Sequence, residues 1–401
     1  MSHPVSHPSI MKKHFLFFIF LFLISCLGQI SSDLYLPALP AIRTAFGTTN
    51  HLMQLSLAIY MFGFSVSQLF YGPISDHLGR KKPLTIGLAI CMIGTLLCQL
   101  SSNVSLLIIG RFIQGAGAGS GAALYLSITS DVYQGNRLAK IGSFLNISRV
   151  VLLACSPLIG SYLLRAFHWK ACFIFLFVYA GICFVGSLTV LRETNHNINA
   201  DKIYFFRTIK NIAILFKHRI FISYTFCVML AFGGILAWLT TLPFLLQDVV
   251  HLTPVEFGWT AAIAGLFFIV GGFINAMIVE HFGLRRMLMI GLLIMLLGSI
   301  VMLFYGLMHK IDTLVIMIPV VIYIIGSSFV FSNAYAGAMV SFTEGVGTAA
   351  SVYGFLQIIG GSISSFLMSM MHTYDQIPLA IVLMLSAAIA LAVVKIQKLA
   401  S

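Results

Sequence analysis

The chain alternates between long apolar stretches and short polar turns along its whole length. Most apolar stretches contain about 20 residues, which is enough for an α-helix to cross a hydrocarbon core of about 30 Å. The pattern therefore predicts an all-α polytopic membrane protein with twelve transmembrane helices. The predicted spans are 14–36, 52–71, 84–101, 104–127, 139–164, 171–191, 219–241, 257–279, 287–308, 313–336, 346–370 and 376–395.

One polar turn, Gly72 to Pro83 between the second and third spans, is unusually rich in charge and glycine. A shorter version of it returns between the eighth and ninth spans, at Glu280 to Arg286. An acid, a histidine, a glycine and a basic pair match, while Leu284 stands where the first turn has Arg80. Many polytopic membrane proteins are built from such internal repeats. We therefore expect two pseudo-symmetric six-helix bundles, 1–191 and 219–401, joined by a cytoplasmic linker, 192–218.

The composition, 59% hydrophobic and 8% charged, excludes a soluble globular protein, in which about a quarter of the residues are charged. A net charge of +12 raises the question of nucleic-acid binding. However, seventeen of the 23 lysines and arginines fall on one side of the predicted spans, and this asymmetry marks the cytoplasmic side of a membrane protein. The charge therefore indicates a membrane protein with both termini in the cytoplasm and no nucleic-acid partner. The membrane that we expect is the cell inner (plasma) membrane. The opposite side has only Arg43, Arg165, Lys170 and Lys310.

Other features limit the possible functions. All seven cysteines lie in predicted spans, so a disulfide framework is not expected, and the first apolar segment is interpreted as a retained span. The basic linker is interpreted as a plain connection, with a regulatory segment as the alternative. The sequence has no Walker-type phosphate loop and no clear metal or nucleophile cluster. We therefore expect no enzyme, no metal and no cofactor, and an ion gradient as the source of energy.

Four motifs, in order along the chain, resemble motifs of the major facilitator superfamily. The turn at 72–82 is similar to the loop signature between its second and third spans, with His77 in place of a basic residue. The segment 32–40 looks like the end of the first span in the Bcr/CflA drug exporters. The segment 111–117 resembles the fourth-span motif of the proton-coupled drug antiporters. The segment 157–173 looks like their fifth-span motif, carried by Pro157 and Gly160, and the corner after it.

The resemblance covers essentially the whole chain and implies the fold of this superfamily, in which two bundles rock around a midplane cavity. It implies proton-coupled efflux, by antiport, of drugs or small amphipathic metabolites, carried out by a monomer in the lipid bilayer. Cys155, Ser156 and Ser161 depart from the fifth-span motif and leave the direction of transport open. The alternatives are a carrier for an anionic metabolite or metal chelate, including uptake, and a membrane-embedded sensor.

Asp33 is a carboxylate inside an apolar span, where such a group is costly unless it is paired, hydrated or protonated. At 1.5 Å per residue it lies roughly 27 Å along the first helix from Phe15, next to a proline-containing corner. One interpretation is a proton site that alternates between charged and neutral forms. The other is an aspartate that only anchors the helix end. The family resemblance favours the proton site.

Arg111 enters the fourth span from the opposite direction and reaches a depth of about 10 Å. There it can approach Asp33 and favour the charged carboxylate, so Asp33 and Arg111 are the predicted proton-coupling pair. The alternative is a structural arginine bonded to carbonyls of the first span. Gln114, one turn further on the same face, extends either network. A nearby glycine series indicates close helix packing: Gly115, Gly117, Gly119 and Gly121.

Arg149 lies about 14 Å into the fifth span, close to the midplane. An arginine at that depth faces a cavity or a partner. It is either a cation that selects anionic or zwitterionic substrates or a structural partner of carbonyls, and the sequence leaves both open. The candidate substrate contacts are Tyr35, Gln114 and Arg149, with Tyr125, Trp238 and Asn333 as further cavity residues.

The charged turn is also expected to form a conformational latch. In the family that the chain resembles, its aspartate faces the start of the eleventh span and its arginine meets an acid at the end of the fourth. Here this implies Asp76 near Val346 to Ala349, with Glu344 as a rival cap, and Arg80 beside Asp131. A helix N-terminus attracts a carboxylate, and such a latch favours the outward-facing state; alternatively, the charges only orient the protein in the membrane. The predicted latch residues are Gly72, Asp76, Gly79, Arg80, Lys81 and Asp131.

Overall fold

The computed structural model describes residues 8–195, 215–340, 342 and 346–396, and all regular elements within them are helical. Two are short irregular turns, the 3₁₀ turn η1 (Leu36–Ala38) and the π turn η2 (Leu245–Val249). The α-helices are α1 (Pro8–Asp33), α2 (Leu39–Phe46), α3 (Asn50–Leu78), α4 (Lys81–Leu100), α5 (Val104–Val132), α6 (Gly135–Ala166), α7 (Lys170–Thr189), α9 (Arg219–Phe244), α10 (Pro254–Phe282), α11 (Leu284–Leu307), α12 (Thr313–Met339), α13 (Val346–Ser369) and α14 (Ile377–Ile396).

Each of the twelve predicted spans corresponds to a long helix of the described chain. Eleven of these segments are both long and apolar enough to cross a membrane, with α1 continuing through η1 into α2. The twelfth, α5, is less apolar because it contains Arg111, Gln114 and the glycine series. It packs between α3 and α4 and also contacts α1, so other helices shield its polar groups from lipid. The prediction of a twelve-helix all-α membrane protein is confirmed.

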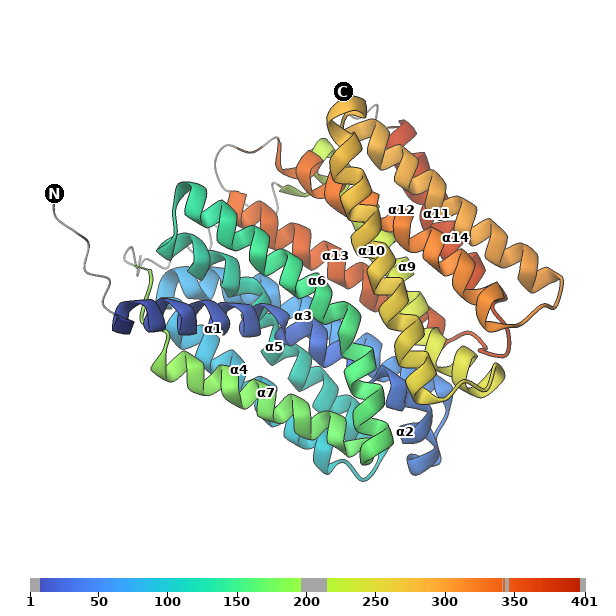
Figure 1. Ribbon diagram of the computed structural model, residues 1–401, viewed down its shortest axis with the longest axis horizontal. Helices are drawn as coiled ribbons and strands as arrows, with labels where there is room; N and C mark the ends of the chain where they lie inside the picture. The colour runs from blue at the N-terminus through green and yellow to red at the C-terminus, as the bar shows by residue number, and fades with distance from the viewer. Residues whose placement is uncertain (1–7, 196–214, 341, 343–345, 397–401) are drawn as a thin grey trace.

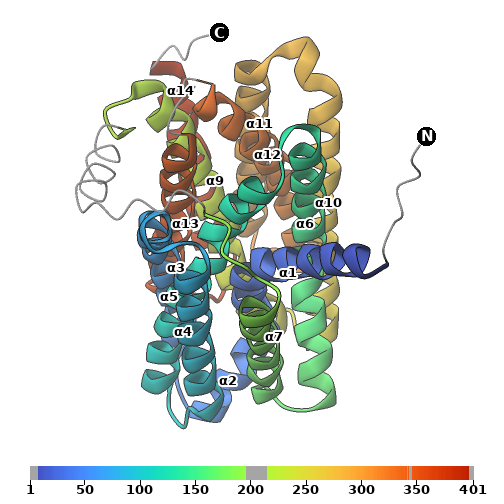
Figure 2. The same ribbon diagram turned by 90° about the vertical axis from the view of Figure 1, so that its left-hand side faces the viewer.

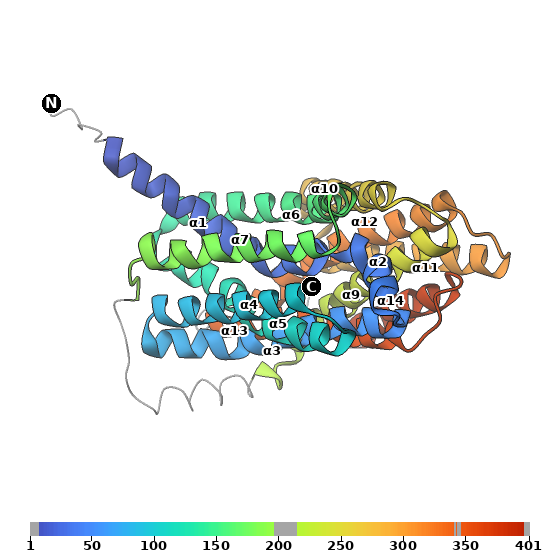
Figure 3. The same cartoon turned by 90° about the horizontal axis from the view of Figure 1, so that it is seen from below.

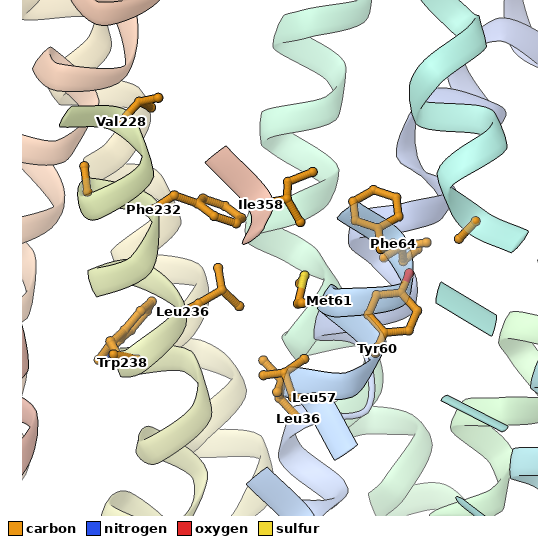
Figure 4. Packing of buried hydrophobic residues seen from close by; sticks show 14 of the residues in the cluster. Leu36, Leu57, Tyr60, Met61, Phe64, Val228, Phe232, Leu236, Trp238 and Ile358 are labelled. Carbon is orange, nitrogen blue, oxygen red and sulfur yellow. The ribbon is translucent and has the colours of Figure 1, made fainter. Parts of the chain in front are cut away.

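The helices form two groups (Figure 1), α1 to α7 on one side and α9 to α14 on the other. The groups meet chiefly where α3 packs on α13 and α6 packs on α10, and Figure 2 shows α13 beside α3. The apolar core continues across this boundary. In Figure 4, Ile358 of α13 lies between Phe232 of α9 and Met61 of α3. The linker bounds stay a prediction, since 196–214 lie outside the described residues.

The first span does not continue as one straight helix. α1 ends at Asp33, and the chain passes through η1, which has Pro37 in its first turn, before α2 begins. Proline has no backbone N–H to donate, so it fits the first turn of a helix but interrupts a longer one. α2 stops at Gly47, whose φ of 57° is the left-handed conformation that glycine adopts most easily. The result is a break in the backbone beside the first predicted site residue.

Charged residues distinguish the two ends of the bundle. The Arg43 face consists of α2, η2 and the helix ends next to them, and Figure 3 shows α2 beside α9. The Arg80 face consists of the turn between α3 and α4 and the helix ends next to it. The basic-residue asymmetry predicts that the Arg80 face is cytoplasmic.

The close contact of α4 with α5 depends on glycine. A Cβ at Gly117 would collide with backbone atoms of Gly87 and Cys91. We predict that Gly117→Ala lowers the free energy of unfolding by about 1–3 kcal/mol, as overpacking does elsewhere, measured as a lower thermal midpoint in detergent. Gly272→Ala is the matched control, because nothing lies within 4 Å of its added Cβ. Equal midpoints for the two variants would contradict this packing.

Candidate functional site

A cavity of about 250 Å³ lies between the two groups of helices. Its two walls differ in chemistry. Residues of α1 and α6 supply both charged side chains of the lining, Asp33 and Arg149. Helices α9, α10 and α12 supply all of its aromatic side chains. The main polar and aromatic lining residues are Gln29, Asp33, Asn146, Arg149, Gln357, Phe232, Trp238, Phe268 and Phe331.

Asp33 is the last residue of α1 and is only 4% exposed. Its Oδ1 accepts a hydrogen bond of 2.5 Å from Ser32 Oγ. No ion pair involves Asp33 among the described residues. A cavity carboxylate with so few partners is well suited to gain or lose a proton when its surroundings change.

Arg111 is completely buried. Its guanidinium carbon lies 4.1 Å from the ring centre of Tyr35 and 4.0 Å from that of Tyr60. Its Nη1 donates to the carbonyl of Ser31 at 2.8 Å and to Gln114 Oε1 at 2.6 Å, while Nε and Nη2 have no hydrogen-bond partner. In this structure Arg111 therefore holds the backbone of α1 two residues before Asp33 and makes no direct ion pair with that carboxylate.

Two predicted substrate contacts lie behind the cavity wall. Tyr35 is fully buried, with its hydroxyl 3.1 Å from Ser56 Oγ and its ring over Arg111. Gln114 is also buried and donates to Thr95 Oγ1 at 3.0 Å. Neither side chain lines the cavity, so the structure places both in the network that holds Arg111.

Of the other candidate residues, some line the cavity and others do not. Arg149 lines the cavity, and its Nη1 donates to the hydroxyl of Tyr125 at 2.5 Å. The guanidinium also lies 5.0 Å from the Tyr125 ring centre, and no carboxylate pairs with it among the described residues. Trp238 is a lining residue. Tyr125 and Asn333 are not. Asn333 donates instead to Asn275 Oδ1 at 2.7 Å.

The fifth-span motif lies on α6 next to the break after α1. Pro157 lines the cavity. A Cβ at Gly160 would collide with the carbonyl oxygen of Leu34, so this glycine lets α6 approach the chain directly after Asp33. The structure thus brings the predicted motif residues together with the predicted proton site.

On the Arg80 face, the predicted contact between Arg80 and Asp131 is present, with Arg80 Nε 3.0 Å from Asp131 Oδ2. Arg80 also pairs with Asp76, one helical turn earlier. All three residues belong to the first group of helices, so these ion pairs brace that group internally. The predicted contact of Asp76 with Val346 to Ala349 falls largely on side chains outside the described set, and so does Glu344.

Glu193, just after α7, has a role that the sequence did not reveal. Its carboxylate accepts the backbone N–H groups of Arg80 at 2.7 Å and Lys81 at 3.2 Å. Burial favours the neutral form, but these bonds and those from Thr194 and Asn195 lower the pKa of Glu193. Gly79, with φ 84°, fits here because a Cβ would collide with the carboxylate. Glu193 thus caps the start of α4, which is a favourable position for a negative charge.

Comparisons with known proteins agree with this geometry. The model of the Major Facilitator Superfamily matches residues 21–395. An uncharacterized MFS-type transporter, YdgK, of Bacillus subtilis is 30% identical over 370 residues, which cover 92% of this chain and 91% of the relative. Multidrug resistance protein D of Escherichia coli is 27% identical, with 89% of each chain covered. A bicyclomycin resistance protein homolog of Haemophilus influenzae is 24% identical, with 92% of each chain covered.

Solved structures of the same shape include the xylose transporter XylE from E. coli in a partially occluded inward-open conformation. Its TM-score is 0.70 at 14% identity, covering 94% of this chain and 96% of that one. A peptide transporter in complex with sulfate has a TM-score of 0.75 at 14% identity, covering 99% of this chain and 95% of that one. At these identities the likeness concerns the fold alone.

The cap formed by Glu193 can be tested directly. We predict that Glu193→Ala speeds hydrogen exchange of the Arg80 and Lys81 amides on the order of 10-fold, since hydrogen bonds to a charged acceptor are lost. Because the pKa of Glu193 is lowered on folding, the cap stabilises the fold above about pH 4, near the usual glutamate value. That stabilisation is lost as the pH falls through the folded-state pKa. Glu256→Ala is the control, because Glu256 caps the start of another helix, α10, on the Arg43 face. Equal exchange of the Arg80 and Lys81 amides in both variants would refute the cap.

Proposed function

The chain belongs to the Major Facilitator Superfamily, and on this premise we propose that it exports small amphipathic molecules from the bacterial cytoplasm in exchange for protons. That it is a multi-pass transporter of small molecules, and not an enzyme, follows from the family and the apolar helices. The substrate class, the proton coupling and the direction are the proposal. We also propose that the protein works as a monomer in the inner membrane, with both termini in the cytoplasm.

The observation that carries the proposal is the two-walled cavity between the groups of helices. Its aromatic wall, with Phe232, Trp238 and Phe268, offers an apolar surface to the body of a ligand. Its charged wall, with Asp33 and Arg149, offers partners to a polar group. Ligand pockets generally combine a mostly apolar lining with a few convergent polar groups. Such a cavity suits amphipathic ligands, and two relatives carry drug-resistance names.

Proton coupling through Asp33 is the second part of the proposal. The carboxylate lies at the cavity, at the end of α1, and Arg111 holds the same turn of backbone. A movement of α1 relative to α5 changes the distance from Asp33 to a permanent positive charge, and with it the balance between its charged and neutral forms. A bound cation favours ionised Asp33, so cation binding and protonation compete. Such competition is what an antiporter requires.

The ion pairs of Arg80 support a role for the charged turn in the cycle. We propose that they keep the turn between α3 and α4 rigid where it approaches α13. Gly72 lies at this approach, since a Cβ there would be 3.7 Å from Ser351 Oγ. Lys81, at the start of α4, is fixed against α7, because its Nζ donates to the carbonyl of Leu188 at 3.0 Å.

The role of Asp33 is tested with tetraphenylphosphonium, a hydrophobic cation. Its binding to the detergent-solubilised protein is expected to release up to about one proton per molecule, because a cation favours the ionised carboxylate. The release is measured with a pH dye in weak buffer. Asp33→Asn should bind the probe without releasing a proton. Asp312→Asn is the control, because Asp312 caps α12 at the protein surface and asparagine caps equally well. Undiminished release from Asp33→Asn would remove Asp33 from the mechanism.

A second candidate function, a carrier for organic anions, is favoured by Arg149. This guanidinium lines the cavity without a carboxylate partner among the described residues. A charge at such depth is costly unless it is compensated, and a substrate anion would compensate it. The two candidate functions differ in whether substrate binding releases a proton or takes one up. An anion disfavours ionised Asp33, so it would bind together with a proton and be carried in the same direction.

Tetraphenylborate, which has nearly the same shape as the phosphonium probe, distinguishes the two candidates. We predict that Arg149→Gln weakens borate binding on the order of 10-fold, as expected when the attraction between opposite charges about 10 Å apart is lost at an effective dielectric constant of about 20. The same change should not weaken phosphonium binding, because it removes a positive charge that repels a cation. Arg149→Lys keeps the charge and should retain most of the borate affinity. Calorimetric titration gives both affinities. Equal effects of Arg149→Gln on the two probes would exclude charge selection by Arg149.

A further inference from the structure

On the Arg43 face, a charged pair joins the two groups of helices. Arg43 of α2 donates from Nη1 to Asp248 Oδ2 at 2.6 Å and from Nη2 to Asp248 Oδ1 at 3.2 Å. This two-pronged geometry is the strongest arrangement that arginine forms with a carboxylate. The side chains are 26% and 29% exposed, so the pair lies where water can reach it when it opens.

Further polar contacts surround this pair and also cross between the groups. Arg43 Nη1 donates to Asn50 Oδ1 at 2.6 Å, and Asn50 Nδ2 donates to Thr373 Oγ1 at 2.8 Å. Next to Asp248, Gln247 Nε2 donates to the carbonyl of Pro37 at 3.1 Å. The contacts therefore tie α2, η1 and the start of α3 to η2 and the segment after α13.

The pair is connected along the chain to the candidate proton site. Asp33 ends α1, η1 begins three residues later at Leu36, and α2 with Arg43 follows directly. Arg111 holds the carbonyl of Ser31 on the other side of this break. A change in the last turn of α1 therefore reaches α2 through a few residues of irregular backbone, which is where hinge motions are usually absorbed.

We propose that Arg43, Asp248, Asn50 and Thr373 form a gate that closes the cavity on the Arg43 face and must separate once in every transport cycle. This inference rests on the transport function proposed above, and it adds residues that the cavity itself does not contain. Partly exposed polar contacts suit a gate, because water can take over their hydrogen bonds when the two groups of helices separate. Together they hold one state without making it permanent.

Thiol labelling tests the gate without substrate or a proton gradient. All native cysteines are first replaced, and Asn146→Cys then introduces a single cysteine into the lining of the cavity. A membrane-impermeant maleimide is added to the Arg43 face of oriented vesicles. Arg43→Ala or Asp248→Ala is expected to raise the labelling rate about 5-fold, which corresponds to about 1 kcal/mol for a favourable exposed pair. Exchanging the charges, with Arg43→Asp and Asp248→Arg together, should return the rate towards that of the unaltered gate.

Two controls keep the result decisive. Arg165→Ala removes an exposed arginine near the end of α6 on the same face, and it should leave the rate unchanged. Labelling from the Arg80 face detects unfolding, because a misfolded variant would label faster from both faces. Unchanged labelling in Arg43→Ala, or an exchanged pair no slower than the single variants, would overturn the gate. Either result leaves the cavity and the proton-release experiment untouched, so the failure of the gate is distinguishable from the failure of the transport proposal.

Discussion

The site depends on how one buried guanidinium is accommodated in an interior of low dielectric constant. A charged group in such surroundings is costly unless polar atoms and aromatic rings surround it. Arg111 of α5 obtains this environment from the rings of Tyr35 and Tyr60 and from the carbonyl of Ser31. These partners belong to α3 and to the end of the first span, so accommodating one charge fixes three segments relative to one another. The position of Asp33 follows from this arrangement.

The same place is where the first span stops being a regular helix. Irregular backbone at membrane depth is tolerated only where protein or a water-filled cavity surrounds it. Here Arg111 donates a hydrogen bond to the carbonyl of Ser31 before the break, and Gly160 lets α6 pack against the backbone of Leu34 after it. One irregular segment therefore carries the candidate proton site, borders the cavity and leads into α2. The candidate proton site and the proposed hinge between α1 and α2 therefore lie within a few consecutive residues.

The sequence was sufficient to predict the helices, because a span needs only length and apolar composition, and α5 was recognised although Arg111 interrupts it. The family resemblance was sufficient to predict the contact of Arg80 with Asp131. Side-chain direction at the broken corner was not predictable, since helical periodicity does not apply there, and Tyr35 packs on Arg111 instead of lining the cavity. Pairs formed by the packing of distant helix ends were also missed. Arg43 and Asp248 are 205 positions apart, and nothing near either residue indicates the other.

The division of the cavity into a charged wall and an aromatic wall has a consequence for how such a protein changes over time. The charged wall comes from α1 and α6, beside the break and its fixed network, where a substitution disturbs several partners at once. The aromatic wall comes from α9, α10 and α12, where residues such as Phe268 and Phe331 contact each other edge to face. Exchanges among large apolar side chains there alter the shape offered to a ligand and leave the ionisable groups alone. Substitutions in the second group of helices can therefore change which ligands fit the cavity, while the first group keeps its ionisable residues. A change of ligand does not require a change in the residues around Asp33.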